Sequence, residues 1–107
     1  MIIAHLAIGL VSLIAPKQMA FSALPTQWQC VAFYESTDNI KAVNPVSGDS
    51  GAFQFQESTW SEYAPISFPN SPLNASLFQQ FEVAQIVYKA QGAKAWETAN
   101  LCNLGGK

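Results

Sequence analysis

Two cysteines, Cys30 and Cys102, constrain the fold more than any other residues, because a bond between them would close a loop over most of the domain. That domain is small. About 85 residues follow an apolar N-terminal segment, and a core of that size is marginal without a further staple. Closing such a loop stabilises a fold by roughly 4 kcal/mol through chain entropy. The alternative is two buried free thiols; an oxidising compartment favours the disulfide.

The N-terminal segment is nearly unbroken apolar sequence from Met1 to Ala15 and stops at Pro16-Lys17. This run is short for a membrane-spanning helix, which needs roughly twenty residues, and it suits the apolar region of a secretory signal peptide. We expect residues 1–23 to be a leader, cleaved after Ser22 or Ala23, and residues 24–107 to form one domain. A buried N-terminal helix or an uncleaved anchor is the alternative.

Composition excludes several classes of function. The chain has five lysines, no arginine and seven acidic residues, with a net charge of -2, so it lacks the clustered cations of a nucleic-acid binder. The only histidine, His5, lies in the expected leader, which removes Ser-His-Asp and Cys-His mechanisms from the mature protein. The sequence contains neither a zinc motif nor a phosphate-binding loop. We therefore expect no metal and no cofactor.

The periodicity of apolar residues predicts a small, mainly α fold (small α+β). Thr26 and Gln29 have the spacing of a capping box, which predicts a helix over about 27–36. A turn-rich loop follows, then a short strand or extended turn over 52–56 and a short helix over 57–63. A long apolar helix is predicted to end at about Gln91, with Gly92 as its C-terminal cap and with two candidate starts, Ser71-Pro72 and Ser76.

Glu35 carries the main functional hypothesis. The predicted first helix places it on one stripe with Trp28, Val31 and Ala32, so its carboxyl group faces an apolar environment. Burial raises the pKa of a carboxyl group and keeps it protonated near neutral pH, as a general acid attacking a glycosidic bond requires. The alternative is that Glu35 merely closes the helix and points to water.

Other residues contribute weaker predictions. Asp49 lies in the loop that faces the Glu35 region and is the one plausible second carboxylate, whereas Glu82 and Glu97 are predicted to be solvated surface charges. The aromatic rings of Phe53, Trp60 and Tyr63 could stack on sugars, although Trp60 could equally belong to the core. Trp28 and Trp96 are assigned to core packing.

The order of several motifs resembles the resuscitation-promoting-factor or transglycosylase-like domain of the lysozyme superfamily. These motifs are Glu35-Ser36, a turn loop, Gly51-Ala52-Phe53-Gln54-Phe55, Ser58-Thr59-Trp60, a long helix ending Gln91-Gly92, and Trp96 before Cys102. The resemblance implies a compact lysozyme-like fold that acts on the glycan strands of bacterial peptidoglycan. It makes Glu35 the single catalytic glutamate and places Gln54 and Trp60 in the glycan groove.

The sequence departs from the family pattern near the glutamate. Tyr34 stands where the family usually has its first cysteine, and Cys30 lies one helical turn earlier on the same face. Cys102 is displaced as well, six residues after Trp96. The family's Gly-Gly pair after Glu-Ser is replaced by Thr37-Asp38.

These inferences together predict a secreted, cell-wall-associated and monomeric muralytic enzyme. It would cleave the β-1,4 bond between N-acetylmuramic acid and N-acetylglucosamine, with water or the muramoyl 6-hydroxyl as nucleophile. Contact with a membrane is expected only through the N-terminal segment, if that segment stays uncleaved. The alternatives are a non-catalytic glycan-binding module and a structural envelope or phage protein on the same fold.

Overall fold

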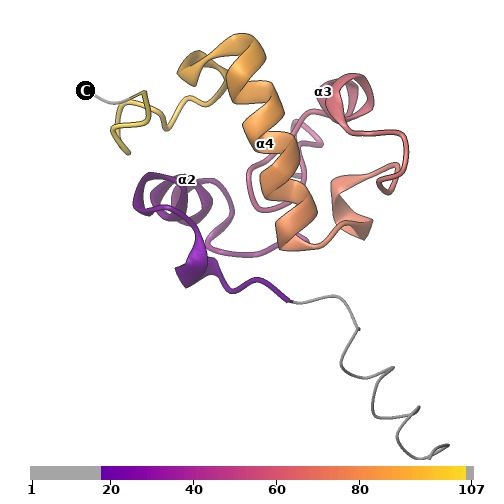
Figure 1. Cartoon of the computed structure of the whole chain (residues 1–107), viewed down its shortest axis with the longest axis horizontal. Helices are drawn as coiled ribbons and strands as arrows, with labels where there is room; N and C mark the ends of the chain where they lie inside the picture. The colour runs from indigo at the N-terminus through magenta and orange to yellow at the C-terminus, as the bar shows by residue number, and fades with distance from the viewer. Residues whose placement is uncertain (1–17, 106–107) are drawn as a thin grey trace, which may run out of the picture.

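The structure is a computed structural model that describes residues 18–105; residues 1–17, which hold most of the predicted leader, and residues 106–107 lie outside it. In the described range the fold is mainly helical, as predicted. Helix α4 lies between α2 and α3 (Figure 1). The elements are η1 (Phe21–Ala23), α2 (Thr26–Ser36), α3 (Glu57–Tyr63), η2 (Pro72–Asn74), α4 (Leu77–Gln91) and η3 (Ala93–Ala95).

Helix α4 forms where the sequence predicts it. Ser76 is its N-cap: the Ser76 hydroxyl accepts from the Gln79 backbone N–H at 3.1 Å, and the Gln79 side chain accepts from the Ser76 N–H at 3.0 Å. Gly92 ends the helix with a φ of 79°, a conformation that glycine adopts without strain. Val83, Ala84 and Val87 on its inner face are buried in the core.

Helix α2 begins without the predicted capping box. Its N-cap is Pro25, and no side chain caps it. The Gln29 amide instead donates to the Leu24 carbonyl at 2.8 Å and to the Ser22 carbonyl at 3.1 Å, which ties η1 to α2. The prediction is wrong because the Gln29 side chain finds acceptors in the preceding turn, while proline fixes φ at the helix entry without a donor to satisfy.

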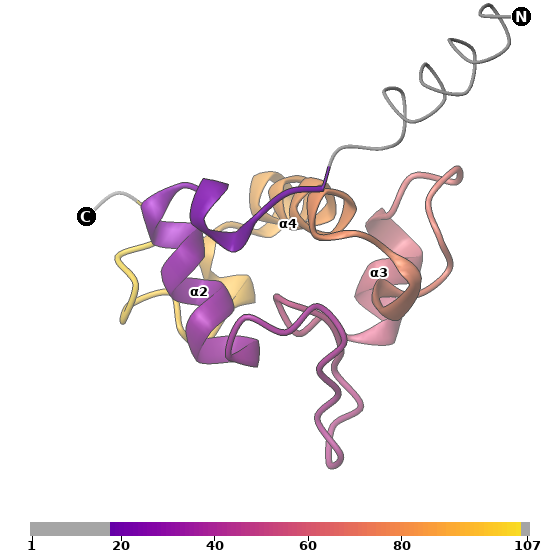
Figure 2. The same ribbon diagram turned by 90° about the horizontal axis from the view of Figure 1, so that it is seen from below.

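The segment between α2 and α3 forms turns rather than a strand in the described chain. Two isolated antiparallel bridges, Val43–Ser50 and Ser50–Phe55, fold it into a narrow loop that projects from the body (Figure 2). Of the two predicted alternatives for 52–56, the segment forms a turn and not a strand, although the turn is not extended throughout. Gln54 has a φ of 53°, which breaks the extended conformation there.

Aromatic side chains build the centre of the core around Trp28. Its ring makes edge contacts with Phe53, Phe81, Tyr88 and Trp96, at centroid distances of 5.0–5.8 Å. Such edge-to-face pairs add about 0.5–1.5 kcal/mol each beyond area burial. The assignment of Trp28 and Trp96 to the core is confirmed.

A fully buried glutamine, Gln80 of α4, ties the loops to this core. Its amide nitrogen donates to the carbonyls of Ile40, Pro72 and Ala75, and its oxygen accepts from the Ala52 N–H at 2.7 Å. A Cβ at Gly51 would lie 2.5 Å from that oxygen, so only glycine fits there. Burial is tolerated because both the nitrogen and the oxygen of the amide have hydrogen-bond partners.

A disulfide joins Cys30 of α2 to Cys102, as predicted, with the two Cα atoms 5.5 Å apart. The displacement of both cysteines from the family pattern leaves the bond intact, since Cys30 keeps to the face of α2 that meets the C-terminal segment. Within residues 18–105, none of the helices has the length and apolar character needed to cross a membrane.

Candidate active site

Glu35 lies in the last turn of α2, half-buried, on the face where Trp28, Val31 and Ala32 are buried. The helix ends one residue later, at Ser36. Thr37 takes a left-handed conformation (φ 56°, ψ 42°), and its N–H bonds the Phe33 carbonyl at 2.9 Å. The inward direction of Glu35 follows from the helical period, as predicted.

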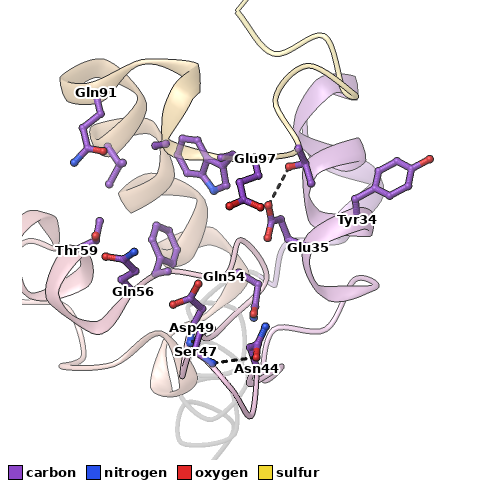
Figure 3. Close-up of a pocket in the computed structure, with 15 residues that line it drawn as sticks. Tyr34, Glu35, Asn44, Ser47, Asp49, Gln54, Gln56, Thr59, Gln91 and Glu97 are labelled. Atoms are coloured by element: carbon purple, nitrogen blue, oxygen red, sulfur yellow. Dashed lines mark hydrogen bonds between the residues drawn. The ribbon is translucent and has the colours of Figure 1, made fainter.

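A cleft of about 690 Å³ opens in front of Glu35. Its volume falls within the range of small-molecule sites. The walls come from the end of α2, the projecting loop, the start of α3, the end of α4 and the segment after η3 (Figure 3). The lining residues are Tyr34, Glu35, Asn44, Ser47, Asp49, Gln54, Phe55, Gln56, Thr59, Val87, Gln91, Ala95, Trp96, Glu97 and Thr98.

The electrostatics of the cleft favour a protonated Glu35. Burial raises the pKa of its carboxyl group, a hydrogen bond from Thr98 lowers it, and the nearby charges of Glu97 and Asp49 raise it further. The Thr98 hydroxyl donates to Oε2 of Glu35 at 3.0 Å. On balance the pKa of Glu35 is displaced upward, which is the direction that favours a proton donor over an ordinary surface carboxylate.

Glu97 and Asp49 both face the catalytic candidate. Figure 3 shows the Glu97 carboxylate beside Glu35 and Asp49 across the cleft, on the projecting loop. Asp49 thus lies in the region where the sequence predicts it. Glu97 corrects the prediction: it is exposed, as a surface charge would be, but it lines the cleft.

The segment carrying Glu97 and Thr98 is missed by sequence reasoning, although a signal for it exists. Cys102 lies four residues after Thr98, and Cys30 lies five residues before Glu35. The predicted disulfide therefore brings the two stretches close together, so the polar residues between Trp96 and Cys102 were candidates for contact with Glu35.

Gln54 lines the cleft from the turn after Gly51. Its amide nitrogen donates to the Gly51 carbonyl at 3.0 Å and to the Ala42 carbonyl at 3.3 Å, which fixes the side chain against the loop. Among the described residues its carbonyl oxygen has no hydrogen-bond donor. It can therefore accept a hydrogen bond from a ligand in the cleft.

The predicted aromatic residues lie elsewhere. Phe53 is 0% exposed and Trp60 is 1% exposed, so neither ring offers a face to a sugar. The Trp60 indole N–H donates to the Pro69 carbonyl at 2.8 Å. Of the two roles predicted for Trp60, sugar stacking and core packing, its burial supports core packing. Tyr63 does not line the cleft; its hydroxyl accepts a bond of 3.4 Å from Gln91, which does. The reason is core packing: the Phe53 ring contacts Trp28 and Phe81, and the Trp60 ring contacts Phe55.

Within the described part of the chain, no group of three or more His, Cys, Asp or Glu side chains could hold a metal ion. The chemistry visible in the cleft is that of carboxylates, hydroxyls and amides.

A mainly helical domain with a half-buried glutamate of raised pKa at the end of its first full helix, facing an open polar cleft, has the arrangement of the lysozyme-like class of folds. The chain is a member of the transglycosylase-like domain family, whose pattern matches residues 22–99. This membership of a transglycosylase-like family of the lysozyme superfamily agrees with the motif order.

Two staphylococcal proteins are similar to it. The probable transglycosylase SceD 2 of Staphylococcus saprophyticus is 40% identical over 79 residues, which is 73% of this chain and 32% of that protein. The probable transglycosylase SceD of Staphylococcus aureus strain Newman is 44% identical over 70 residues, 64% of this chain and 30% of that protein. The chain thus spans about a third of the length of these relatives.

Proposed function

We propose that the protein cleaves the β-1,4 bond between N-acetylmuramic acid and N-acetylglucosamine in bacterial peptidoglycan, with Glu35 as its single acid and base. The observation that carries the proposal is the half-buried Glu35, with its raised pKa, in the open cleft of a transglycosylase-like domain. The cleft lining contains three carboxylates and no lysine, which suits an uncharged sugar backbone better than a polyanion.

The reaction starts with proton transfer from Glu35 to the glycosidic oxygen. The C1–O bond breaks, and its electron pair leaves with the protonated oxygen as the hydroxyl of the departing sugar. The Glu35 carboxylate then takes the proton of the muramoyl 6-hydroxyl as that oxygen bonds to C1, which gives a 1,6-anhydro sugar and restores the acid. Family membership favours this intramolecular nucleophile over water.

Two cleft residues are proposed to bind the glycan. The Gln54 carbonyl oxygen would accept a bond from a sugar hydroxyl or amide, and Asp49 would do the same from the projecting loop. The charge of Asp49 would also stabilise the positive charge that develops at C1. A second carboxylate acting only through its charge is compatible with a single-glutamate mechanism.

The cellular location is proposed from the disulfide and the leader. A disulfide persists in an oxidising compartment, and the apolar start of the chain suits export. We therefore propose a secreted, wall-associated protein.

The test is mass spectrometry of the soluble products formed from purified peptidoglycan by the wild-type protein, by Glu35→Gln and by Glu62→Gln. Glu62 is an exposed acid of α3 outside the cleft and serves as the matched control. We expect 1,6-anhydro-muropeptides from the wild type and the control, and a loss of at least about 100-fold in Glu35→Gln. Reducing-end products would indicate water as the nucleophile. Full activity in Glu35→Gln, or no fragments from the folded wild type, would refute the proposal.

A further inference from the structure

Two contacts, one on each side of Thr98 in the sequence, fix the segment that carries Thr98 beside Glu35. On its N-terminal side, the Trp96 indole N–H donates to the buried Phe53 carbonyl at 3.0 Å. On its C-terminal side, Cys102 is bonded to Cys30 of α2. These two anchors lie within four residues of Thr98, and neither depends on Glu35. The Thr98–Glu35 contact is therefore imposed by the fold and is not a chance meeting of two surface side chains.

The hydrogen bond distinguishes the two oxygens of Glu35. Thr98 Oγ1 donates to Oε2 at 3.0 Å, the bond drawn as a dashed line to Glu35 in Figure 3. No hydrogen bond to Oε1 is formed among residues 18–105. A carboxylic acid has one hydroxyl and one carbonyl oxygen, and an oxygen that already receives a hydrogen bond is favoured as the carbonyl. The proton of the acid is thereby directed to Oε1.

We propose that Thr98 is a positioning residue for the acid: by donating to Oε2 it keeps the proton on Oε1 and aims that oxygen into the cleft. The inference rests on the proposed role of Glu35 as proton donor. It assigns the two oxygens separate tasks, with Oε2 anchored and Oε1 transferring the proton to the glycosidic oxygen.

The same contact serves both halves of the reaction. After Oε1 has given up its proton, Glu35 is a carboxylate, and Thr98 continues to donate to Oε2 without moving. A donor that stays in place while charge develops lowers the cost of reorganisation in the step. The hydrogen bond also counteracts burial: it lowers the pKa of Glu35 while desolvation raises it, so the group can act as acid first and as base afterwards.

The experiment compares Thr98→Val, which removes the hydroxyl at nearly constant volume, with Thr98→Ser, which keeps it. Thr26→Val is the matched control, since Thr26 is exposed at the far end of α2 and makes no side-chain capping bond. On purified peptidoglycan we expect Thr98→Val to lose about tenfold in kcat with KM nearly unchanged, because a hydrogen bond to an ionisable group is lost. Thr98→Ser should restore most of the activity.

The pH profile separates positioning from general damage. Activity requires protonated Glu35 and is lost as pH rises through its pKa. Removing the Thr98 donor raises that pKa, so the alkaline limb should move to higher pH in Thr98→Val and stay in place in Thr98→Ser and Thr26→Val. An unmoved limb in Thr98→Val, or an equal loss of activity in Thr98→Ser, would overturn the inference.

An NMR titration of the Glu35 carboxyl carbon distinguishes this inference from the proposed function. If the wild type releases no fragments but the Glu35 pKa still rises in Thr98→Val, the contact is real and the proposed function fails. If the wild type is active and the Glu35 pKa is the same in Thr98→Val, the proposed function stands and the role of Thr98 is wrong.

Discussion

At the scale of single residues, the burial that suits Glu35 to its proposed function also makes its ionised form unfavourable for the stability of the fold. Burial raises its folded pKa above the ordinary value of 4.5. The stabilising contribution of the protonated side chain is therefore complete below the unfolded pKa and is lost as pH rises through the folded pKa. The fold would be more stable at neutral pH without this ionisable group, a cost that the catalytic role proposed for Glu35 would account for.

We expect Glu35→Gln to melt at a higher temperature than the wild type at about pH 8 and at nearly the same temperature at about pH 4, because glutamine cannot ionise. Thermal unfolding followed by circular dichroism at several pH values measures the difference. Glu62→Gln, which removes an exposed charge, should show a difference that hardly changes with pH. A Glu35→Gln effect independent of pH would show that desolvation does not govern this site.

Some features of single residues could be predicted from the sequence and others could not. The direction of Glu35 could be predicted because helical periodicity is a local property, and Trp28, Val31 and Ala32 mark the inner face. The burial of Phe53 and the hydrogen bonds of Gln80 could not, because both depend on partners between 5 and 43 residues away along the chain. Thr98 and Glu97 are a different case, because the predicted Cys30–Cys102 bond already indicated that their segment lies near Glu35.

At the scale of elements, the helices with clear stop and start signals were predicted well. The helix start at Ser76, the cap at Gly92 and the bounds of α3 all agree with the sequence prediction. The bounds of α2 agree to within one residue but its cap does not, since Thr26 and Gln29 have capping-box spacing without forming a capping box. A local motif decides a helix end only where the side chain has no better partner, and Gln29 has two carbonyls of the preceding turn within reach.

The backbone conformation at the end of α2 shows what the replacement of the Gly-Gly pair by Thr37-Asp38 costs. Both residues have positive φ values, 56° and 58°, so this chain adopts with L side chains a conformation that glycine favours. A β-branched residue in this region is strained by roughly 1–2 kcal/mol. The loop beside the acid is therefore built at some cost in stability.

Thr37→Gly should stabilise the protein by about 1 kcal/mol and raise its melting temperature by about 4 °C, because relief of strain exceeds the added entropy of the unfolded chain. The matched control is Thr26→Gly, at a position inside α2 with helical geometry, where glycine should lower stability slightly. Urea denaturation of both variants provides the comparison. Equal destabilisation by the two glycines would mean that Thr37 carries no strain.

At the scale of the whole molecule, the cleft joins distant parts of the chain. Glu35 comes from α2, Asp49 and Gln54 from the projecting loop, and Thr98 from the segment beyond α4. In the described chain, the Cys30–Cys102 bond is the covalent link between the first and last of these parts, and it spans 72 residues. The disulfide therefore contributes to the geometry of the site as well as to the stability of the fold.

Removing the bond with the double variant Cys30→Ala/Cys102→Ala should lower the free energy of unfolding by about 4 kcal/mol. Activity per folded molecule should fall as well, since Thr98 loses one of its two anchors.

The variant Val83→Ala separates the loss of stability from the loss of site geometry. It destabilises the buried face of α4 by about 2 kcal/mol without touching the cleft, so its activity per folded molecule should stay near that of the wild type. Urea denaturation and assays below the unfolding range measure both quantities. If the double variant keeps wild-type activity when folded, the disulfide acts on stability alone and the Trp96 anchor suffices to hold Thr98.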